Sequence, residues 1–460
     1  MSLHSSQSSD PSFASAPGAR PAGPAAPADA PVPVPHAAGP ADLPSRASAP
    51  SGIERRRALS VERVAPAAAA HLELPVVRPA GLLRAPASAG AWLPADVHPD
   101  TPADVVAPFS EAVAALLFGG PIDATLADRP ELEDEILGRA RRLAARAYPA
   151  ERVSDRSTDR WVDHAARDEL HRALLACYQP HVRLPHHGMA ENQFHPLAVR
   201  LLRVLEGAWE RDLLARARRS AQRAVGDDLT EAALPAEPAA FCEWFKRAAF
   251  THPLYEHPLY AFLAGEADRA QLERFLRFEA AGEAAFDDLV ALGQVGTRGE
   301  VKIEMGRNYW DELGNGKSHA VHTHLFHRLT DALGVTAPEA RELPWQVLSG
   351  ANLMMWSCVP RRNAFRAQGT LGAVELLAPQ RCTRLTAGAA RVGIPKKAMV
   401  YYAAHAIVDI GHAEGWLDHV VAPQVTERPE ARVGIAEGLL ARADASLDYF
   451  DYALAALRAG

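Results

Sequence analysis

The chain has 460 residues, of which 48% are hydrophobic, enough for two or three domains with a sizeable core. Its 49 lysines and arginines against 56 aspartates and glutamates give a formal charge of −7, so no basic excess favours nucleic acid or an anionic membrane as partner. Four scattered cysteines without a CxxC pair argue against a disulfide framework or a cysteine-rich zinc site. No secretory signal pattern and no apolar run near the ~18 residues of a membrane span are present, which predicts a cytoplasmic protein.

Residues 1–100 predict a disordered Ala/Pro-rich tail. They hold 17 of the 36 prolines and only two aromatic residues, Phe13 and Trp92. Such a composition cannot bury enough apolar surface to fold alone. A transit peptide is the alternative, because the first fifty residues are poor in acids, but they are also poor in arginine and lack amphipathic periodicity.

Residues 101–236 predict an accessory helical region. Apolar residues recur at spacings of three and four, and the predicted helices lie within residues 101–120, 129–149, 158–181 and 195–220. Five histidines of this region do not pair with carboxylates at ligand spacing, so we interpret them as surface or capping residues: His164, His171, His186, His187 and His195. A charged, proline-containing segment places a domain boundary near residue 236.

Residues 237–460 predict an all-α bundle of seven or eight helices. No segment shows sustained two-residue alternation, so a sheet is not expected. The helical segments are 240–250, 269–293, 299–314, 319–334, 344–357, 364–378, 395–421 and 430–460.

Three polar residues interrupt the apolar segment YYAAHAIVDIGHAEGW, residues 401–416: His405, Asp409 and His412. At about 100° per residue, Asp409 lies about 40° from His405 and His412 about 20° to the other side, so the three share one stripe of a helix. The stripe should face the core, because its neighbours are large and mostly apolar: Tyr401, Tyr402, Val408 and Trp416. Burying three such groups without hydrogen bonds or a metal costs several kcal/mol, so the stripe predicts metal ligands.

Carboxylates at apolar positions of other predicted helices are candidate partners, since metal sites in bundles draw ligands from several helices. Glu279 lies between Phe275 and Phe286, Glu312 precedes a glycine break, and Glu375 has no charged residue within four positions. Taken singly, each also has an ordinary explanation: Glu279 could lie at the boundary of the core, Glu312 at a solvated helix end, and Glu375 in an ion pair with Arg381.

The stretch KSHAVHTHLFHRL follows the glycine break and should supply one more imidazole. His319 and His322 share a helix face, His324 points away and His327 lies between. The donor set then contains about four carboxylates, three histidines and no thiolate, which favours iron or manganese over copper or zinc. That is too many donors for one ion, and it predicts a dinuclear site.

The order of these residues resembles that of the haem-oxygenase-like diiron oxidases and oxygenases, which bind two irons and no haem. The series is Glu279, then NYWDELGNG leading to His322, then the buried Glu375, then H-x3-D-x2-H at 405–412. The resemblance covers roughly residues 237–425, and the last motif is its most specific element. It implies a haem-oxygenase-like helical bundle. The metal ligands it implies are Glu279, Glu312, His322, Glu375, His405, Asp409 and His412. His319 is the alternative to His322, and Asp409 would bind metal only in some states.

The activity that the resemblance implies is oxidation of a small organic substrate with two ferrous ions as cofactor and O2 as co-substrate. N-oxygenation, desaturation or C–C cleavage of an amine or carboxylate compound is expected, and an external electron donor is compatible with it. The additional helical layer predicts a homodimer surface, and no nucleic acid or membrane is expected as partner. Candidates for binding a substrate carboxylate are Arg307, Arg361 and Arg362, and candidates for hydrogen bonds to the ligands are Tyr309, Tyr401 and Tyr402.

Other functions stay open at this stage. A haem oxygenase would need one proximal histidine and leave the other polar groups without a purpose. A metal-free thiaminase-type enzyme would need a cysteine nucleophile, for which Cys358 and Cys382 are candidates, and ferritin-like diiron proteins normally carry two E-x-x-H motifs, which this chain lacks. A non-catalytic metal-binding or helical interaction protein is the remaining alternative.

Overall fold

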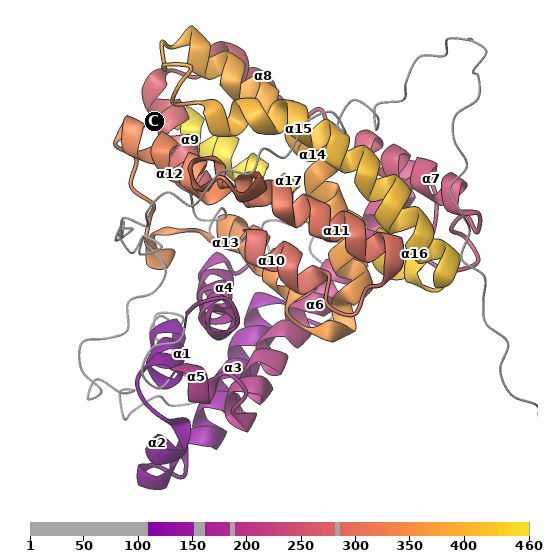
Figure 1. The fold of residues 1–460 in the computed structure, drawn as a ribbon. Coiled ribbons are helices and arrows are strands. Elements are labelled where there is room, and N and C mark those ends of the chain that lie inside the picture. Colours follow the sequence, from indigo (N-terminus) through magenta and orange to yellow (C-terminus); the bar gives the residue numbers. More distant parts are fainter. Residues whose placement is uncertain (1–108, 151–161, 185–188, 281–285, 460) are drawn as a thin grey trace, which may run out of the picture. The chain divides into compact units, whose positions relative to one another are not determined.

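The computed structural model describes residues 109–150, 162–184, 189–280 and 286–459. Within these ranges every regular element is a helix and no strand is present (Figure 1). The predicted all-α fold class is therefore confirmed. The predicted tail, residues 1–100, and two histidines of the accessory region, His186 and His187, lie outside the described ranges.

The accessory region forms helices where the periodicity places them. The longest, α6, begins after His195, whose imidazole accepts a hydrogen bond from the Leu197 N–H, and it ends at Gly226 in the left-handed conformation, φ 76°. The predicted boundary near residue 236 falls in the connection that follows, and the division into domains stays a prediction. The helices are α1 (Phe109–Phe118), α2 (Ile122–Asp128), α3 (Leu132–Ala147), α4 (His164–Tyr178), α5 (Met189–Asn192) and α6 (Pro196–Val225).

The described residues after 236 form the predicted bundle. Eight of its α-helices exceed ten residues, in agreement with the expected seven or eight. The helices are α7 (Pro238–Thr251), α8 (Pro258–Ala261), α9 (Arg269–Glu279), α10 (Phe286–Gly293), α11 (Gly299–Glu312), α12 (His322–Leu333), α13 (Trp345–Cys358), α14 (Ala364–Arg391), α15 (Val400–Trp416), α16 (Ala422–Glu427) and α17 (Ala431–Arg458).

Helix α14 packs along α15 and α17 and forms the centre of the bundle (Figure 1). Its close approach to α17 depends on small residues, since a Cβ atom at Gly369 would lie 1.9 Å from the carbonyl oxygen of Ile435. The sequence predicts that this helix ends before Pro379, but it continues through the proline to Arg391. Burial of its apolar positions against two neighbours outweighs the ~3 kcal/mol that an internal proline costs.

Two other predicted helix boundaries differ from the structure. The segment 269–293 is not described as one helix, because α9 ends at Glu279 and α10 begins at Phe286. In the segment 395–421, the α-helix α15 begins only at Val400 and ends at Trp416, and the last five residues, Leu417–Val421, form a π-helical turn.

Buried polar contacts join the accessory helices to the bundle. Arg216 of α6 forms a two-pronged ion pair with Asp448 of α17, at 2.6 and 2.8 Å. His171 of α4 is fully buried and contacts the Tyr148 hydroxyl at 2.7 Å and the Asn352 amide at 3.1 Å. The prediction of a surface or capping histidine is therefore wrong for His171, because its imidazole is satisfied inside the core.

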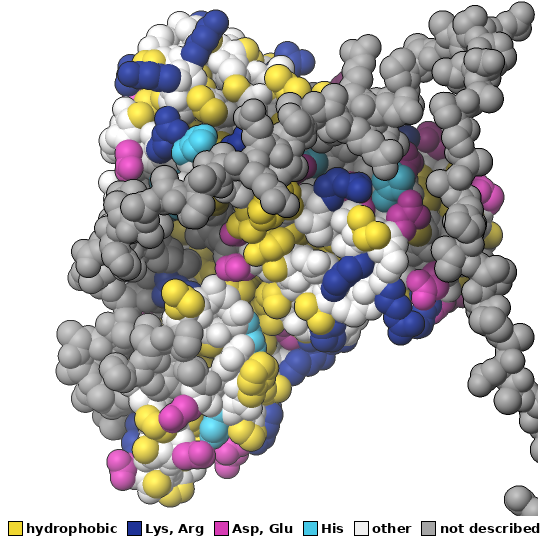
Figure 2. All heavy atoms as spheres, in the orientation of Figure 1, with side chains coloured by type: hydrophobic (Ala, Val, Ile, Leu, Met, Phe, Trp, Pro, Cys, Tyr) yellow, Lys and Arg dark blue, Asp and Glu magenta, His cyan; other side chains and the backbone are white. Residues whose placement is uncertain are grey.

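Among the described residues, no single helix is long and apolar enough to cross a membrane, although α1 and α2 meet that test as a bent pair. Figure 2 shows one face of the chain, where basic and acidic side chains are interspersed with apolar ones. Several apolar side chains are exposed on α11 and α15, including Ile303 and Ile407.

Candidate metal centre

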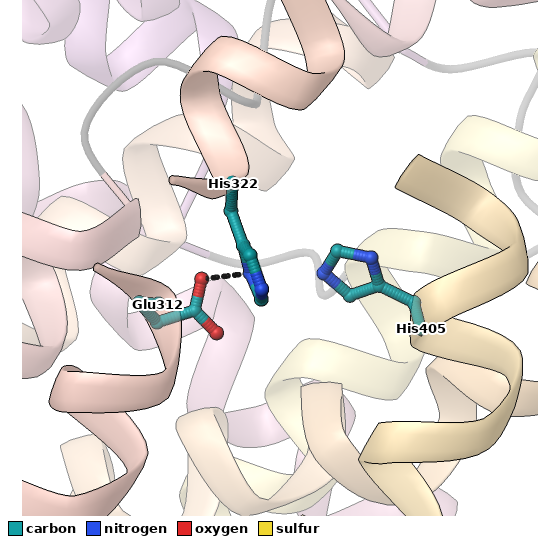
Figure 3. A group of neighbouring side chains, drawn as sticks. All are labelled: Glu312, His322 and His405. Atoms are coloured by element: carbon teal, nitrogen blue, oxygen red, sulfur yellow. Dashed lines mark ion pairs between the residues drawn. The ribbon is translucent and has the colours of Figure 1, made fainter. Parts of the chain in front are cut away.

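A tight turn brings Glu312 and His322 together. Glu312 is the last residue of α11, and His322 is the first residue of α12. Between them, Gly314 adopts φ +63°, and a Cβ atom there would lie 2.4 Å from the Ala320 carbonyl carbon. Glycine permits this close return of the chain. As a result His322 Nδ1 forms an ion pair with Glu312 Oε2 (Figure 3).

His405 faces this pair from α15 (Figure 3). Its ring lies 4.5 Å from the His322 ring, centroid to centroid, and its Nδ1 is 2.8 Å from the Tyr401 carbonyl oxygen. A protonated Nδ1 donating to that carbonyl leaves Nε2 as the ligand atom, the arrangement that orients metal-binding histidines. Glu312, His322 and His405 each offer a ligand atom within 4.8 Å of the others, and we call them the first donor group.

A second donor group consists of Glu312, Glu375 and His412, all buried, with ligand atoms within 4.8 Å of one another. Glu375 of α14 accepts a hydrogen bond from the Asn308 amide at 3.0 Å, and its other oxygen lies 3.2 Å from His412 Nδ1. On the far side of the ring, His412 Nε2 lies 3.1 Å from Asp311 Oδ2. Glu312 belongs to both groups, so its two carboxylate oxygens can serve two ions.

Asp409 is buried beside the second group without belonging to it. Its Oδ1 lies 3.7 Å from His412 Nδ1. As predicted, the stripe of α15 carries all three polar residues toward one site, but it is not wholly buried, since Val408 is 42% exposed.

Glu279, in contrast, is placed outside both donor groups. Its Oε2 pairs with Arg381 Nη1 at 2.6 Å, and its Oε1 accepts a hydrogen bond from the Tyr449 hydroxyl at 2.8 Å. His319 lies in the turn before α12 and is in neither group. Six of the seven predicted ligands thus lie together, and the role of Glu279 as a ligand has no geometric support in the described residues.

Crowding of carboxylates and imidazoles shifts their proton affinities. Burial, followed by the charge of Glu375, raises the pKa of Asp409 to about 9. Burial opposes protonation of His412, but the contacts with Asp311 and Glu375 raise its pKa to about 11. Burial and the neighbouring His322 lower the pKa of His405 to about 3. The raised pKa of Asp409 reflects nearby negative charge and burial, which a bound cation would balance.

The donor chemistry fits iron. The two groups contain carboxylate oxygens and imidazole nitrogens and no thiolate, which suits hard or borderline ions. The four cysteines are buried, and burial raises the pKa of Cys358 to about 12, so it is a poor nucleophile.

A cavity of about 150 Å³ adjoins the donors. Small residues from several helices line it, among them Gly350, Ala378 and Ala445. Glu312, His322, His405 and Asp409 form part of its wall, and so do Arg381 and Arg442.

The candidate carboxylate receivers Arg307, Arg361 and Arg362 do not line this cavity. Arg307 pairs with Glu304, and Arg362 pairs with Glu206 at 2.7 Å. Of the three tyrosines, Tyr401 lines the cavity, and its ring lies 4.2 Å from the His405 ring, centroid to centroid, with the two planes inclined by 44°. The Tyr402 hydroxyl lies 3.5 Å from a carboxylate oxygen of Glu279.

Sequence reasoning missed four residues that the structure places at the site: Asn308, Asp311, Arg381 and Arg442. Helical spacing offered a signal for the first two, because residues 308, 311 and 312 are three and four apart and share a face of α11. No comparable signal identified the arginines, whose positions depend on how α14 and α17 pack.

Residues 273–447 match the family model of iron-containing redox enzymes. The matched segment runs from α9 into α17 and contains every residue of both donor groups. This is the family that the motifs resemble, and the match supports an iron-dependent redox function. No curated protein matches the chain.

Proposed function

We propose that this chain, which matches the model of iron-containing redox enzymes over residues 273–447, binds two ferrous ions and uses them to oxidise a small organic substrate with O2. The observation that carries the proposal is the sharing of Glu312 between two donor groups. One carboxylate placed between two sets of imidazole and carboxylate donors is suited to bridge two ions. When bound, two ferrous ions would supply electrons for the reduction of O2.

In this proposal each side chain has a defined task. His322 and His405 would hold one ion, and Glu375 and His412 the other, with Glu312 between them. Asp409, which lies beside His412, would add a carboxylate to the second ion in some states. The Tyr401 carbonyl and the Asp311 carboxylate would hold the imidazoles of His405 and His412 in the orientation that metal binding needs.

The substrate would occupy the cavity beside the donors. A cavity of about 150 Å³ has room for a ligand of about the size of benzene, so a small substrate is expected. N-oxygenation, desaturation and C–C cleavage of a small amine or carboxylate are the reactions we propose, with an external electron donor where the substrate does not supply every electron.

Iron loading under anaerobic conditions tests the proposal. Apo protein titrated with Fe(II) should bind two ions per chain, and admission of O2 should then cause O2 uptake and a transient change in absorption. A metal-binding protein without catalysis would retain the iron and consume no O2 beyond the rate of free Fe(II). Binding of fewer than two ions per chain would contradict the dinuclear site.

A further inference from the structure

Two arginines line the cavity in addition to the metal donors. Outside the donor groups and Asp409, its charged lining residues are Glu279, Asp287, Arg381 and Arg442. The rest of the wall is mainly apolar or small, with Phe278, Val347 and Leu377 as examples. A charged group in such a wall needs a partner or a ligand, because an unpaired buried charge is costly.

Arg381 is held in a fixed position within this wall. Its side chain is 19% exposed, and its Nη1 lies 2.6 Å from Oε2 of Glu279, whose side chain is 3% exposed. Glu279 is itself held by the Tyr449 hydroxyl at 2.8 Å. The guanidinium presents five N–H donors in a planar fork, a geometry that matches carboxylates in two-pronged hydrogen bonds.

Arg381 lies far enough from the metal donors to leave room for a small ligand between them. It follows Glu375 by six residues on α14, which corresponds to about 9 Å along the helix axis. It lies close enough for its charge to lower the proton affinity of both Asp409 and His405. Arg442, by contrast, extends toward α13, where its Nη1 would lie 3.4 Å from a Cβ atom at Gly350.

We propose that Arg381, oriented by Glu279 and Tyr449, binds the carboxylate of a small and largely apolar carboxylic acid, whose carbon skeleton then lies in the cavity beside the donor groups. This inference rests on the proposed function only in taking the carboxylic acid to be the substrate. An anchored carboxylate fixes which carbon or nitrogen of the acid faces the donors, and such positioning is a large part of catalysis.

Carboxylate binding can be measured without iron or O2, which separates this inference from the proposed function. The probes are benzoate and hexanoate, with benzyl alcohol and benzylamine as the neutral and cationic counterparts. Calorimetry or saturation-transfer NMR on the full-length apo protein should show binding of the two carboxylates and little binding of the counterparts. Preferential binding of benzylamine, or no binding of either carboxylate, would overturn the proposal.

Variants of the ion pair should shift the affinity in opposite directions. Arg381→Gln should weaken benzoate binding at least tenfold, whereas Glu279→Gln should tighten it several-fold, because the guanidinium loses its competing anion. Arg381→Lys keeps the charge without the planar fork and should give an intermediate affinity for benzoate. This conservative variant tests the proposal if the other two variants fold poorly. Arg384→Gln, at an exposed position of α14, is the matched control and should bind benzoate as the parent does.

Iron content provides the second readout. Arg381→Gln should still bind Fe(II), since Arg381 belongs to neither donor group. Loss of benzoate binding with iron binding intact supports the anchor, and benzoate binding unchanged by Arg381→Gln would refute it whatever the iron content.

Discussion

Asp311 and His412 lie 3.1 Å apart, from carboxylate oxygen to imidazole Nε2, while Nδ1 of the same ring faces Glu375 at 3.2 Å. The ring is therefore held between a carboxylate outside both donor groups and one inside the second group. A histidine that binds metal through one nitrogen commonly donates its other N–H to a carboxylate, which fixes the ring and raises its basicity.

Removal of Asp311 should weaken binding of one iron only. We expect Asp311→Ala to lower the affinity of the second donor group for Fe(II) by roughly ten- to a hundredfold, the usual cost of losing such a partner. Asp311→Asn should have a smaller effect, because its amide oxygen still accepts the hydrogen bond without the charge. Isothermal titration with Fe(II) under anaerobic conditions measures both. Asp331→Ala, at an exposed position of α12, is the control, and equal affinities in Asp311→Ala and the control would contradict the positioning role.

The turn at Gly314 gives a second prediction. Gly314→Ala places a Cβ atom 2.4 Å from the Ala320 backbone at φ +63°, so the turn must open and carry His322 away from Glu312. We expect loss of one iron per chain and a decrease in the free energy of unfolding of about 1–3 kcal/mol. Gly334→Ala is the matched control, since Gly334 has φ +65° but nothing within 4 Å of its Cβ position. It should show only the backbone strain, about 1–2 kcal/mol, with iron content unchanged.

Iron counts in ligand variants provide a third prediction. His405→Ala and His412→Ala should each leave one iron per chain, because each histidine belongs to one donor group. Glu312→Gln should weaken binding of both, since Glu312 belongs to the two groups together. His327→Ala, on α12 but in neither group, controls for removal of an imidazole. Two tightly bound irons in Glu312→Gln would contradict the bridging role.

Much of the fold and part of the candidate site could be predicted from local sequence. His405, Asp409 and His412 share a stripe because 3.6-residue periodicity alone decides which residues face one way. Glu312 and His322 were linked by a glycine break that the chain does use as a turn. Such features depend on residues within a few turns of one another, and one sequence is enough to predict them.

Features that depend on long-range packing were not predictable in the same way. Glu279 has the apolar neighbours expected of a ligand, yet its carboxylate meets Arg381, 102 residues away. The continuation of α14 through Pro379 also depends on burial against α15 and α17, which local propensity does not describe. The burial of His171 is a third such feature. Its imidazole contacts Asn352 of α13, 181 residues away, so the sequence around His171 does not reveal that it is buried.

The burial of His171 makes stability depend on pH. Burial, with a smaller contribution from Arg167, lowers the pKa of His171 to about 3, against an ordinary value of 6.5. Because the pKa is lower in the folded state, the stability that the buried neutral imidazole of His171 contributes is fully present above pH 6.5. It is lost as the pH falls from 6.5 toward 3, because only the unfolded chain then binds the proton. At pH 4.5 the loss should be about 2–3 kcal/mol.

Urea unfolding followed by circular dichroism at pH 7.5 and 4.5 measures this effect. His171→Gln should be less stable than the parent at pH 7.5, because its contacts with Tyr148 and Asn352 are altered, but the difference should shrink by about 2–3 kcal/mol at pH 4.5. Tyr148→Phe removes the hydroxyl contact and leaves the imidazole buried, so its stability should fall with acid as steeply as that of the parent. A constant difference between His171→Gln and the parent at the two pH values would show that His171 does not titrate differently on folding. The acid sensitivity that remains in His171→Gln belongs to other groups shared by all three proteins, such as His405, whose pKa is also lowered by burial.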